Sequence, residues 1–244
     1  MNIGKKIGIC AHSYEGGALC FLSTCKEGAQ ILGAHYHPTI ILSAVPMGLS
    51  MPAYETNNHD EVGKYLREGV DRVAKAGADF FICPDNTAHI ILEKIISTLP
   101  IPGLHIADVV CKEIIDNGWK RVGLLGTNWT MTGPVYSQAL KEKNLIKQIP
   151  DDSTREEIHK AIFEELCQGI FRKETIAMFQ NAIENLKNKG AECVILGCTE
   201  IPLIITPENS ALPIVDSTRL LAKYAVRHAL SENNSGDVGW IRII

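Results

Sequence analysis

A single thiol stands where a buried strand is expected to stop. The apolar run Cys193–Leu196 follows a turn of small residues, and Gly197-Cys198-Thr199-Glu200 comes next. A short apolar run between turn residues is typical of a buried strand, so Cys198 is predicted at its end, where the chain turns towards a helix. A thiol in that place can transfer protons. Glu200 is interpreted as an orienting or helix-start carboxylate and is also a candidate substrate contact.

A weak internal repeat gives Cys198 a counterpart in the first half of the chain. It relates residues 77–101 to a segment 113 positions later, and Lys6–Ile9 resembles Arg121–Leu124. The repeat predicts two similar α/β units related by a pseudo-twofold axis, whereas chance similarity is the alternative. In this register Asp85 falls on Cys198. The other matched positions are Gly77 with Gly190, Ala78 with Ala191, Ile82 with Ile195, Ile91 with Ile204, and Leu99–Ile101 with Leu212–Ile214.

Two acid–base groups that face one ligand from opposite sides can invert a stereocentre. One group removes the proton of an acidic C–H bond, and the other delivers a proton to the opposite face. The carbanion between the two steps needs electrostatic stabilisation, which backbone N–H groups and small polar side chains can provide without a cofactor. The polar candidates at the predicted turns are Asn86, Thr87, Thr127, Thr130 and Thr199.

Alternating strands and helices are expected to position these side chains. Such alternation is typical of parallel α/β architecture, in which sites lie at the carboxyl ends of the strands. We expect a first domain of residues 1–106 plus 216–244, a second of 107–215, and an active-site cleft between them. The expected strands are 6–11, 39–45, 79–83, 101–106, 121–126, 193–196 and 213–215. The expected helices are 18–33, 61–76, 88–97, 107–117, 133–143 and 218–231, with 151–188 mostly helical and with loops at 12–17 and 46–60.

Composition excludes several classes of function. A net charge of −4 does not provide the positive charge that binds nucleic acid or an anionic membrane. No apolar run approaches 18 residues, and the N-terminus has no signal-peptide pattern, so a cytoplasmic protein is expected. The eight scattered cysteines are then reduced thiols, and none has zinc-ligand spacing, so no metal is expected.

Four segments together resemble the aspartate/glutamate racemase superfamily. They are DNTAH at 85–89, LLGTNWT at 124–130, LGCTEIPLI at 196–204 and LPIVDSTRLLA at 212–222. The resemblance implies two pseudo-symmetric α/β domains that are Rossmann-like or flavodoxin-like. It also implies a cofactor-independent racemase or epimerase, usually with two catalytic cysteines, that acts on a small amino acid or dicarboxylate as a homodimer.

The sequence departs from this family in its first catalytic position, where Asp85 precedes Asn86 and Thr87 in place of cysteine. Reference pKa values are about 3.9 for Asp and about 8.5 for Cys, so a two-base reaction needs burial to raise the pKa of Asp85. A one-base reaction at Cys198 needs no such change. Cys83, two residues before Asp85, is interpreted as a core neighbour.

A second departure concerns the substrate. No Lys or Arg lies between Lys26 and Lys64, although an acidic amino acid needs a cation for its distal carboxylate. Histidines are the only candidates in that span, and the second unit offers others. These candidates are His35, His37 and His59 in the first half, and Arg155, Lys160, Arg172 and Lys173 in the second.

Structural roles compete with catalytic ones at several of these positions. Asp85, Asn86 and Thr87 could serve as helix caps, as could Asp216 with its neighbours. His89 is expected to be a structural hydrogen bonder, whereas Ser13 in the first loop is a candidate ligand contact. Two other functions stay open: a single-thiol isomerase or decarboxylase of a small dicarboxylate, and a small-acid-binding protein without turnover.

Overall fold

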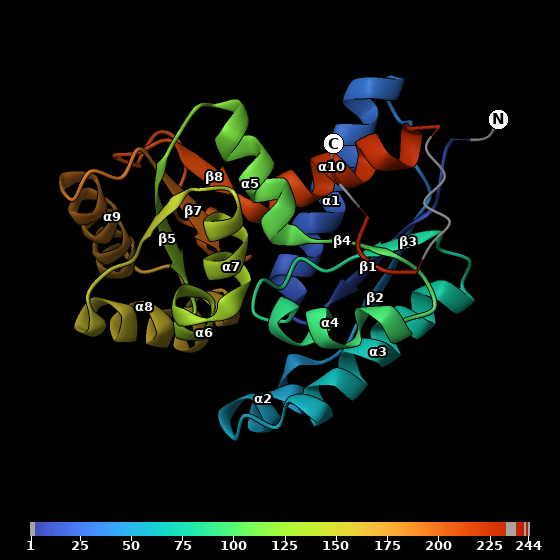
Figure 1. Cartoon of the computed structure of the whole chain (residues 1–244), viewed down its shortest axis with the longest axis horizontal. Helices are drawn as coiled ribbons and strands as arrows, with labels where there is room; N and C mark the ends of the chain where they lie inside the picture. The colour runs from blue at the N-terminus through green and yellow to red at the C-terminus, as the bar shows by residue number, and fades with distance from the viewer. Residues whose placement is uncertain (1–2, 233–237, 242, 244) are drawn as a thin grey trace. The chain divides into compact units, whose positions relative to one another are not determined.

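The chain folds into two compact units, each built on one four-stranded parallel sheet (Figure 1). This computed structural model describes residues 3–232, 238–241 and 243. Unit 1 comprises residues 1–109 and 218–244, and unit 2 comprises residues 110–217. The chain leaves unit 1 within helix α5 (Ile106–Asp116) and returns at the start of α10 (Ser217–Leu230). The parallel α/β class predicted from the sequence is confirmed.

The sheet of unit 1 has the strand order β2-β1-β3-β4. Every residue of β1 and β3 is buried, as expected for central parallel strands that helices cover on both faces. Helices α1 and α10 lie on one side of the sheet, and α3 and α4 lie on the other (Figure 1). The strands are β1 (Ile7–Ala11), β2 (Ile40–Ala44), β3 (Phe80–Ile82) and β4 (Gly103–Leu104); the helices are α1 (Tyr14–Leu32), α2 (Met47–Glu55), α3 (His59–Lys75), α4 (His89–Ile95) and a 3-10 turn, Ile96–Thr98.

The sheet of unit 2 repeats that topology with the order β6-β5-β7-β8. Its central strands β5 and β7 are again almost entirely buried. The strands are β5 (Arg121–Gly126), β6 (Ile146–Gln148), β7 (Cys193–Gly197) and β8 (Ile214–Asp216); the helices are α6 (Asn128–Thr132), α7 (Pro134–Glu142), α8 (Asp152–Glu164) and α9 (Lys173–Asn188), with 3-10 turns at Leu166–Gln168 and Ile201–Leu203.

Strand register confirms the internal repeat. In unit 1, Gly8 of β1 pairs with Phe81 of β3. In unit 2, Gly123 of β5 pairs with Val194 of β7. The sequence similarity aligns Gly8 with Gly123, and the shift of 113 positions carries Phe81 to Val194. The same residues therefore meet in the two sheets, which chance similarity would not produce.

Two segments expected to be loops are helical. Helix α1 begins at Tyr14, inside the predicted loop 12–17, because Ser13 caps it by accepting the N–H of Gly16 at 3.2 Å. Gly17 serves close packing rather than a turn, since a Cβ there would lie 2.8 Å from Ala11 of β1. Helix α2 occupies most of the predicted loop 46–60 and tolerates the internal Pro52.

Three further details differ from expectation. The short elements α6 and β6 were not predicted from the sequence. Strand β6 is a half-exposed edge strand beside β5, and it has too few apolar residues to be recognised as a strand. The expected helix after Cys198 is only a 3-10 turn, Ile201–Leu203. Pro207 disfavours helical backbone at Thr206, so a helix here could not continue past that residue.

The C-terminal segment completes the edge of the first sheet. Gly103 of β4 donates its N–H to Gly239 at 3.0 Å and accepts the N–H of Ile241 at 2.8 Å. Trp240 between them stacks on His89, with ring centroids 5.7 Å apart. This segment therefore covers β4 and packs beneath the turn that follows β3. None of the described helices is long and apolar enough to cross a bilayer.

Two glycines of unit 1 should respond in opposite directions to alanine. A Cβ at Gly8 would lie 2.7 Å from Val73 and 3.1 Å from Ala78, so Gly8→Ala should cost about 1–3 kcal/mol of unfolding free energy. Gly63 in α3 has only ordinary contacts, the nearest at 3.5 Å, so Gly63→Ala should be neutral or stabilising by up to about 1 kcal/mol. Urea unfolding measures both, and equal effects would contradict this packing.

Candidate active site

Polar side chains follow the two central strands of each sheet at matching positions. Ile9 pairs with Ile82, and three residues beyond them lie His12 and Asp85. In unit 2 the corresponding pair, Thr127 and Cys198, lies three residues beyond Leu124 and Ile195. The chain leaves the two central strands of such sheets in opposite directions, and ligands of open α/β sheets bind at this switch point. Each unit therefore carries one half-site there.

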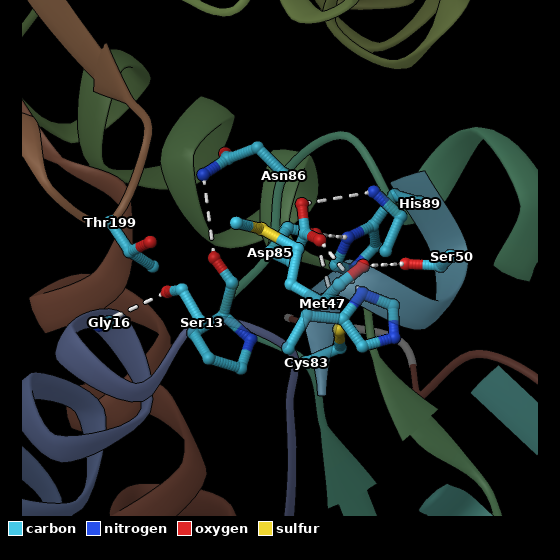
Figure 2. A network of polar contacts seen from close by, with 12 residues as sticks. Ser13, Gly16, Met47, Ser50, Cys83, Asp85, Asn86, His89 and Thr199 are labelled. Atoms are coloured by element: carbon cyan, nitrogen blue, oxygen red, sulfur yellow. Dashed lines mark hydrogen bonds and ion pairs between the residues drawn. The ribbon is translucent and has the colours of Figure 1, made fainter. Parts of the chain in front are cut away.

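In unit 1, Asp85 is held by several donors. Its Oδ2 lies 3.1 Å from Nδ1 of His12, and its Oδ1 accepts the N–H of Ala88 at 3.2 Å. Its backbone carbonyl accepts a hydrogen bond from Nδ1 of His89 at 2.9 Å. Figure 2 shows Asp85 with Asn86 and His89 around it. Asp85 thus caps the turn before α4, as the alternative interpretation proposed, and also forms a hydrogen bond with the ring of His12.

The ionisation of Asp85 differs from what a two-base Asp/Cys reaction requires. Burial on its own raises the pKa of this carboxyl group. The hydrogen bond from His12, the interaction with its ring and the N–H of Ala88 outweigh burial, so the pKa of Asp85 lies below its ordinary value. Asp85 is therefore a carboxylate at neutral pH, and the raised pKa that would make it a proton donor is absent.

His89 has the structural role expected from the sequence. Its ring is fully buried, donates from Nδ1 to Asp85 and accepts the N–H of Ile106 at Nε2, 3.3 Å away. Burial, followed by the nearby charge of His105, lowers the pKa of His89 to about 3. The neutral ring fixes the Asp85 turn against the start of α5.

The remaining unit 1 candidates lie in the loops around Asp85. Asn86 and Thr87 are buried in the turn that follows it. Cys83 is buried on its other side, with Sγ 4.0 Å from the carbonyl of Asp85, and burial raises the pKa of this thiol well above its usual range. Ser13 caps α1, as Figure 2 shows with Gly16. A ligand role for Ser13, Asn86 and Thr87 remains a prediction.

In unit 2, Cys198 shares a carboxylate oxygen with its neighbour. Its Sγ donates to Oε2 of Glu200 at 2.9 Å, and Oγ1 of Thr199 donates to the same atom at 2.8 Å. Within the described part of the chain, Oε1 of Glu200 is buried with no hydrogen-bond partner. Burial, followed by the charge of Glu200, raises the pKa of Cys198 well above its usual range. The resting group is a thiol whose proton points to Glu200.

The other strand end of unit 2 presents hydroxyl groups. Thr127 caps α6 by accepting the N–H of Thr130 at 3.1 Å, and its own hydroxyl donates to Oγ1 of Thr130 at 3.1 Å. Gly126 and Gly197 precede Thr127 and Cys198, and a Cβ on Gly126 would lie 2.7 Å from the carbonyl of Gly197. Glycine is required here because the two backbones approach closely.

The cations proposed for a distal carboxylate make local contacts. Arg155 pairs with Asp152 at 2.8 Å and donates to the carbonyl of Pro150. Lys160 and Arg172 pair with glutamates of their own surroundings, at 3.8 and 3.4 Å. None of these ion pairs includes a residue of either half-site. Among the residues described, no group of three or more His, Cys, Asp or Glu side chains is arranged to hold a metal ion.

His12 is the site residue that sequence reasoning did not select. Its signal was present, because the resemblance of Lys6–Ile9 to Arg121–Leu124 also aligns His12 with the candidate Thr127. The contact between Cys198 and Glu200 could be anticipated from proximity alone. Pairing across neighbouring strands, as between His12 and Asp85, needs the register of the sheet.

Comparisons with known proteins agree on one family. The profile of the Asp/Glu/hydantoin racemase family matches residues 18–225. The broad specificity amino-acid racemase RacX of Bacillus subtilis (strain 168) is 32% identical over 169 residues, covering 69% of this chain and 73% of RacX. A crystal structure from Yersinia pestis, named as an Asp/Glu racemase, superposes with a TM-score of 0.82 at 29% identity, covering 93% of this chain and 100% of the other. The crystal structure of an aspartate racemase homologue from Pyrococcus horikoshii OT3 superposes with a TM-score of 0.74 at 28% identity. The match covers 93% of this chain and 100% of the other.

The buried His89 should make stability fall in mild acid. The folded state keeps this ring neutral down to about pH 3, whereas the unfolded chain binds a proton below about pH 6.5. The unfolding free energy should therefore drop as pH falls below 6.5, by up to about 1.4 kcal/mol per pH unit for this one proton. His89→Gln should remove that part of the slope in urea titrations from pH 7 to 4.5.

His228, whose pKa burial lowers to about 4, contributes a slope of the same sign, so a reduced slope should persist. The control is His35→Asn at an exposed position with φ of 71°, which asparagine tolerates. Parallel slopes for wild type and His89→Gln would contradict the assignment.

The charge of Glu200 should suppress the reactivity of Cys198. Glu200→Gln keeps the size of the side chain but removes the charge that helps to raise the pKa of Cys198, so alkylation by iodoacetamide at pH 7.5 should become several-fold faster. Mass spectrometry of the Cys198 peptide measures the rate, with the half-buried Cys25 as the internal reference. An unchanged ratio of the two rates would show that Glu200 does not control the thiol.

Proposed function

We propose that this chain inverts the α-carbon of a small amino acid by proton transfer, without a cofactor. The chain belongs to the Asp/Glu/hydantoin racemase family and is a racemase, an isomerase. The name of the Bacillus relative supports a broad range of amino acids, and other relatives are named glutamate racemases. The substrate range is proposed to be small amino acids, including acidic ones.

The observation that carries this proposal is the protonated thiol at a switch point. Cys198 lies at the end of β7 with its proton directed to Glu200. A thiol in this state can give its proton to a carbanion, and the resulting thiolate can remove a proton from the opposite antipode. The matching strand end in the repeat carries Asp85, so we propose that each half-site serves one face of the same α-carbon.

The polar residues around the two strand ends are proposed to bind the α-carboxylate and ammonium groups. The hydroxyls of Thr127 and Thr130 suit a carboxylate, because donors stabilise the charge that spreads onto it as the α-proton leaves. Glu200, with one buried oxygen left without a hydrogen bond, suits an ammonium group. The other proposed contacts are Ser13, Asn86, Thr87 and Thr199.

One observation favours a second candidate. The lowered pKa of Asp85 makes it a poor base for a C–H bond, which suits a single-thiol isomerase or decarboxylase of a small dicarboxylate. In that case Asp85→Asn leaves substantial activity, whereas Cys198→Ala removes it. Near-total losses in both variants would favour a two-base reaction in which Asp85 itself carries the proton. The family resemblance also supports a cytoplasmic homodimer. Sedimentation equilibrium measures the oligomeric state.

Exchange of the α-hydrogen in deuterated water tests the proposed reaction. The wild-type protein should incorporate deuterium at Cα of both antipodes of its substrate, followed by NMR across the common amino acids. Cys198→Ala should slow racemisation by about 10²–10⁴-fold, the usual contribution of one acid–base group.

The matched control is Cys25→Ala, which removes a thiol from α1 and should leave the rate unchanged. A wild-type protein that exchanges no α-hydrogen in any common amino acid, of either hand, would show that the racemase proposal is wrong.

A further inference from the structure

We infer that His12 is the proton-transfer group of the Asp85 half-site and that Asp85 positions it. This inference rests on the proposed racemase reaction and names the group that works on the face opposite the Cys198 proton. It differs from the sequence-based assignment, in which Asp85 itself transfers the proton.

The first argument is geometric. Nδ1 of His12 lies 3.1 Å from Oδ2 of Asp85, and the described residues offer no hydrogen bond to Nε2. A carboxylate on one ring nitrogen fixes the tautomer and the orientation of the imidazole, which leaves the other nitrogen to exchange a proton. His12 also lies directly after β1, at the switch point of its sheet.

The second argument concerns the hydrogen bonds of Asp85. Its two carboxylate oxygens are already engaged, one with His12 and the other with the N–H of Ala88. A carboxylate that accepts hydrogen bonds on both oxygens is stabilised as the anion and has little tendency to take a proton from carbon. Its charge is instead suited to stabilising the imidazolium that forms when His12 accepts one.

The third argument eliminates the other titratable groups around this half-site. Cys83 and Tyr54, from the β3 turn and from α2, are buried, and burial raises the pKa of each well above its usual range. His89, from α4, uses both ring nitrogens in hydrogen bonds to backbone groups. His12 is the one group here whose side-chain type exchanges protons near neutral pH and whose second nitrogen stays uncommitted.

The proton balance of the reaction closes with these two groups. Neutral His12 accepts the α-proton of one antipode at Nε2, and the C–H electron pair stays on the substrate carbanion. The Cys198 thiol then gives its proton to the opposite face of that carbon. One turnover leaves imidazolium and thiolate, which is the state needed to convert the other antipode back. No electron is lost or gained, and solvent exchange resets the pair.

Separate exchange experiments on the two antipodes test the assignment. His12→Asn places an amide N–H near the position of Nδ1, so the hydrogen bond to Asp85 can persist while the proton carrier is gone. This variant should lose deuterium incorporation into one antipode by about 10²–10⁴-fold and retain it in the other. Cys198→Ala should show the reverse selectivity.

Asp85→Asn separates positioning from proton transfer. It should retain exchange of both antipodes at a reduced kcat, because the amide can still hold the ring of His12 in place but no longer stabilises the imidazolium that forms. Since His12→Asn can weaken folding, circular dichroism accompanies the assays, and added imidazole should restore exchange of the affected antipode to His12→Ala. A merely structural histidine would give no such rescue.

The outcomes separate this inference from the proposed function. Exchange of both antipodes by His12→Asn at wild-type rates overturns the inference while the racemase function stands. Loss of exchange in Asp85→Asn together with an active His12→Asn also overturns it and makes Asp85 the proton carrier. A wild-type protein that exchanges neither antipode overturns the racemase function itself, and the role of His12 with it.

Discussion

A carboxylate withdrawn from water needs hydrogen-bond donors, and the turn after β3 is arranged to supply them to Asp85. The side chain of Asp85 is 23% exposed and that of its partner His12 is 3% exposed, so hydrogen bonds from the protein supplement the limited contact with solvent. The donors to the carboxylate are His12, directly after β1, and the N–H of Ala88 in the turn itself, whereas His89, the first residue of α4, donates to the backbone carbonyl of Asp85. This need joins the end of β1 to the turn after β3, which is distant from it in sequence, and fixes where His12 must lie.

The two half-sites use carboxylates in opposite ways. In unit 1, donors surround Asp85 and keep it ionised. In unit 2, Glu200 lies against the thiol of Cys198 and keeps that thiol protonated. The same fold and register thus place the carboxylate of Asp85 beside His12 in unit 1. In unit 2 they place the thiol of Cys198, which donates a hydrogen bond, beside the carboxylate of Glu200, which accepts it. In the proposed reaction, unit 1 supplies the group that takes a proton and unit 2 supplies the group that gives one.

The architecture could be predicted from the sequence because apolar runs and the internal repeat can be recognised in the residues themselves. The apolar runs of β1, β5 and β7 and the shared Gly8/Gly123 register were sufficient for two parallel sheets. Helix α2 was missed because Pro52 and the surrounding Met and Asn residues are typical of loops, whereas packing of Ala53 and Tyr54 stabilises a helix. Cys198 and Asp85 could be selected by position, but the ionisation of Asp85 could not, since it depends on His12, 73 residues away in the chain.

The discontinuity of unit 1 has a consequence for the order in which the chain folds during synthesis. Unit 2 is one continuous segment, residues 110–217, so all of it emerges before α10 and the segment around Trp240. The edge of β4 and the packing under His89 are incomplete until those last residues arrive. The Cys198 half can therefore form from one continuous segment, whereas the Asp85 half cannot be completed until α10 and the edge segment have been synthesised.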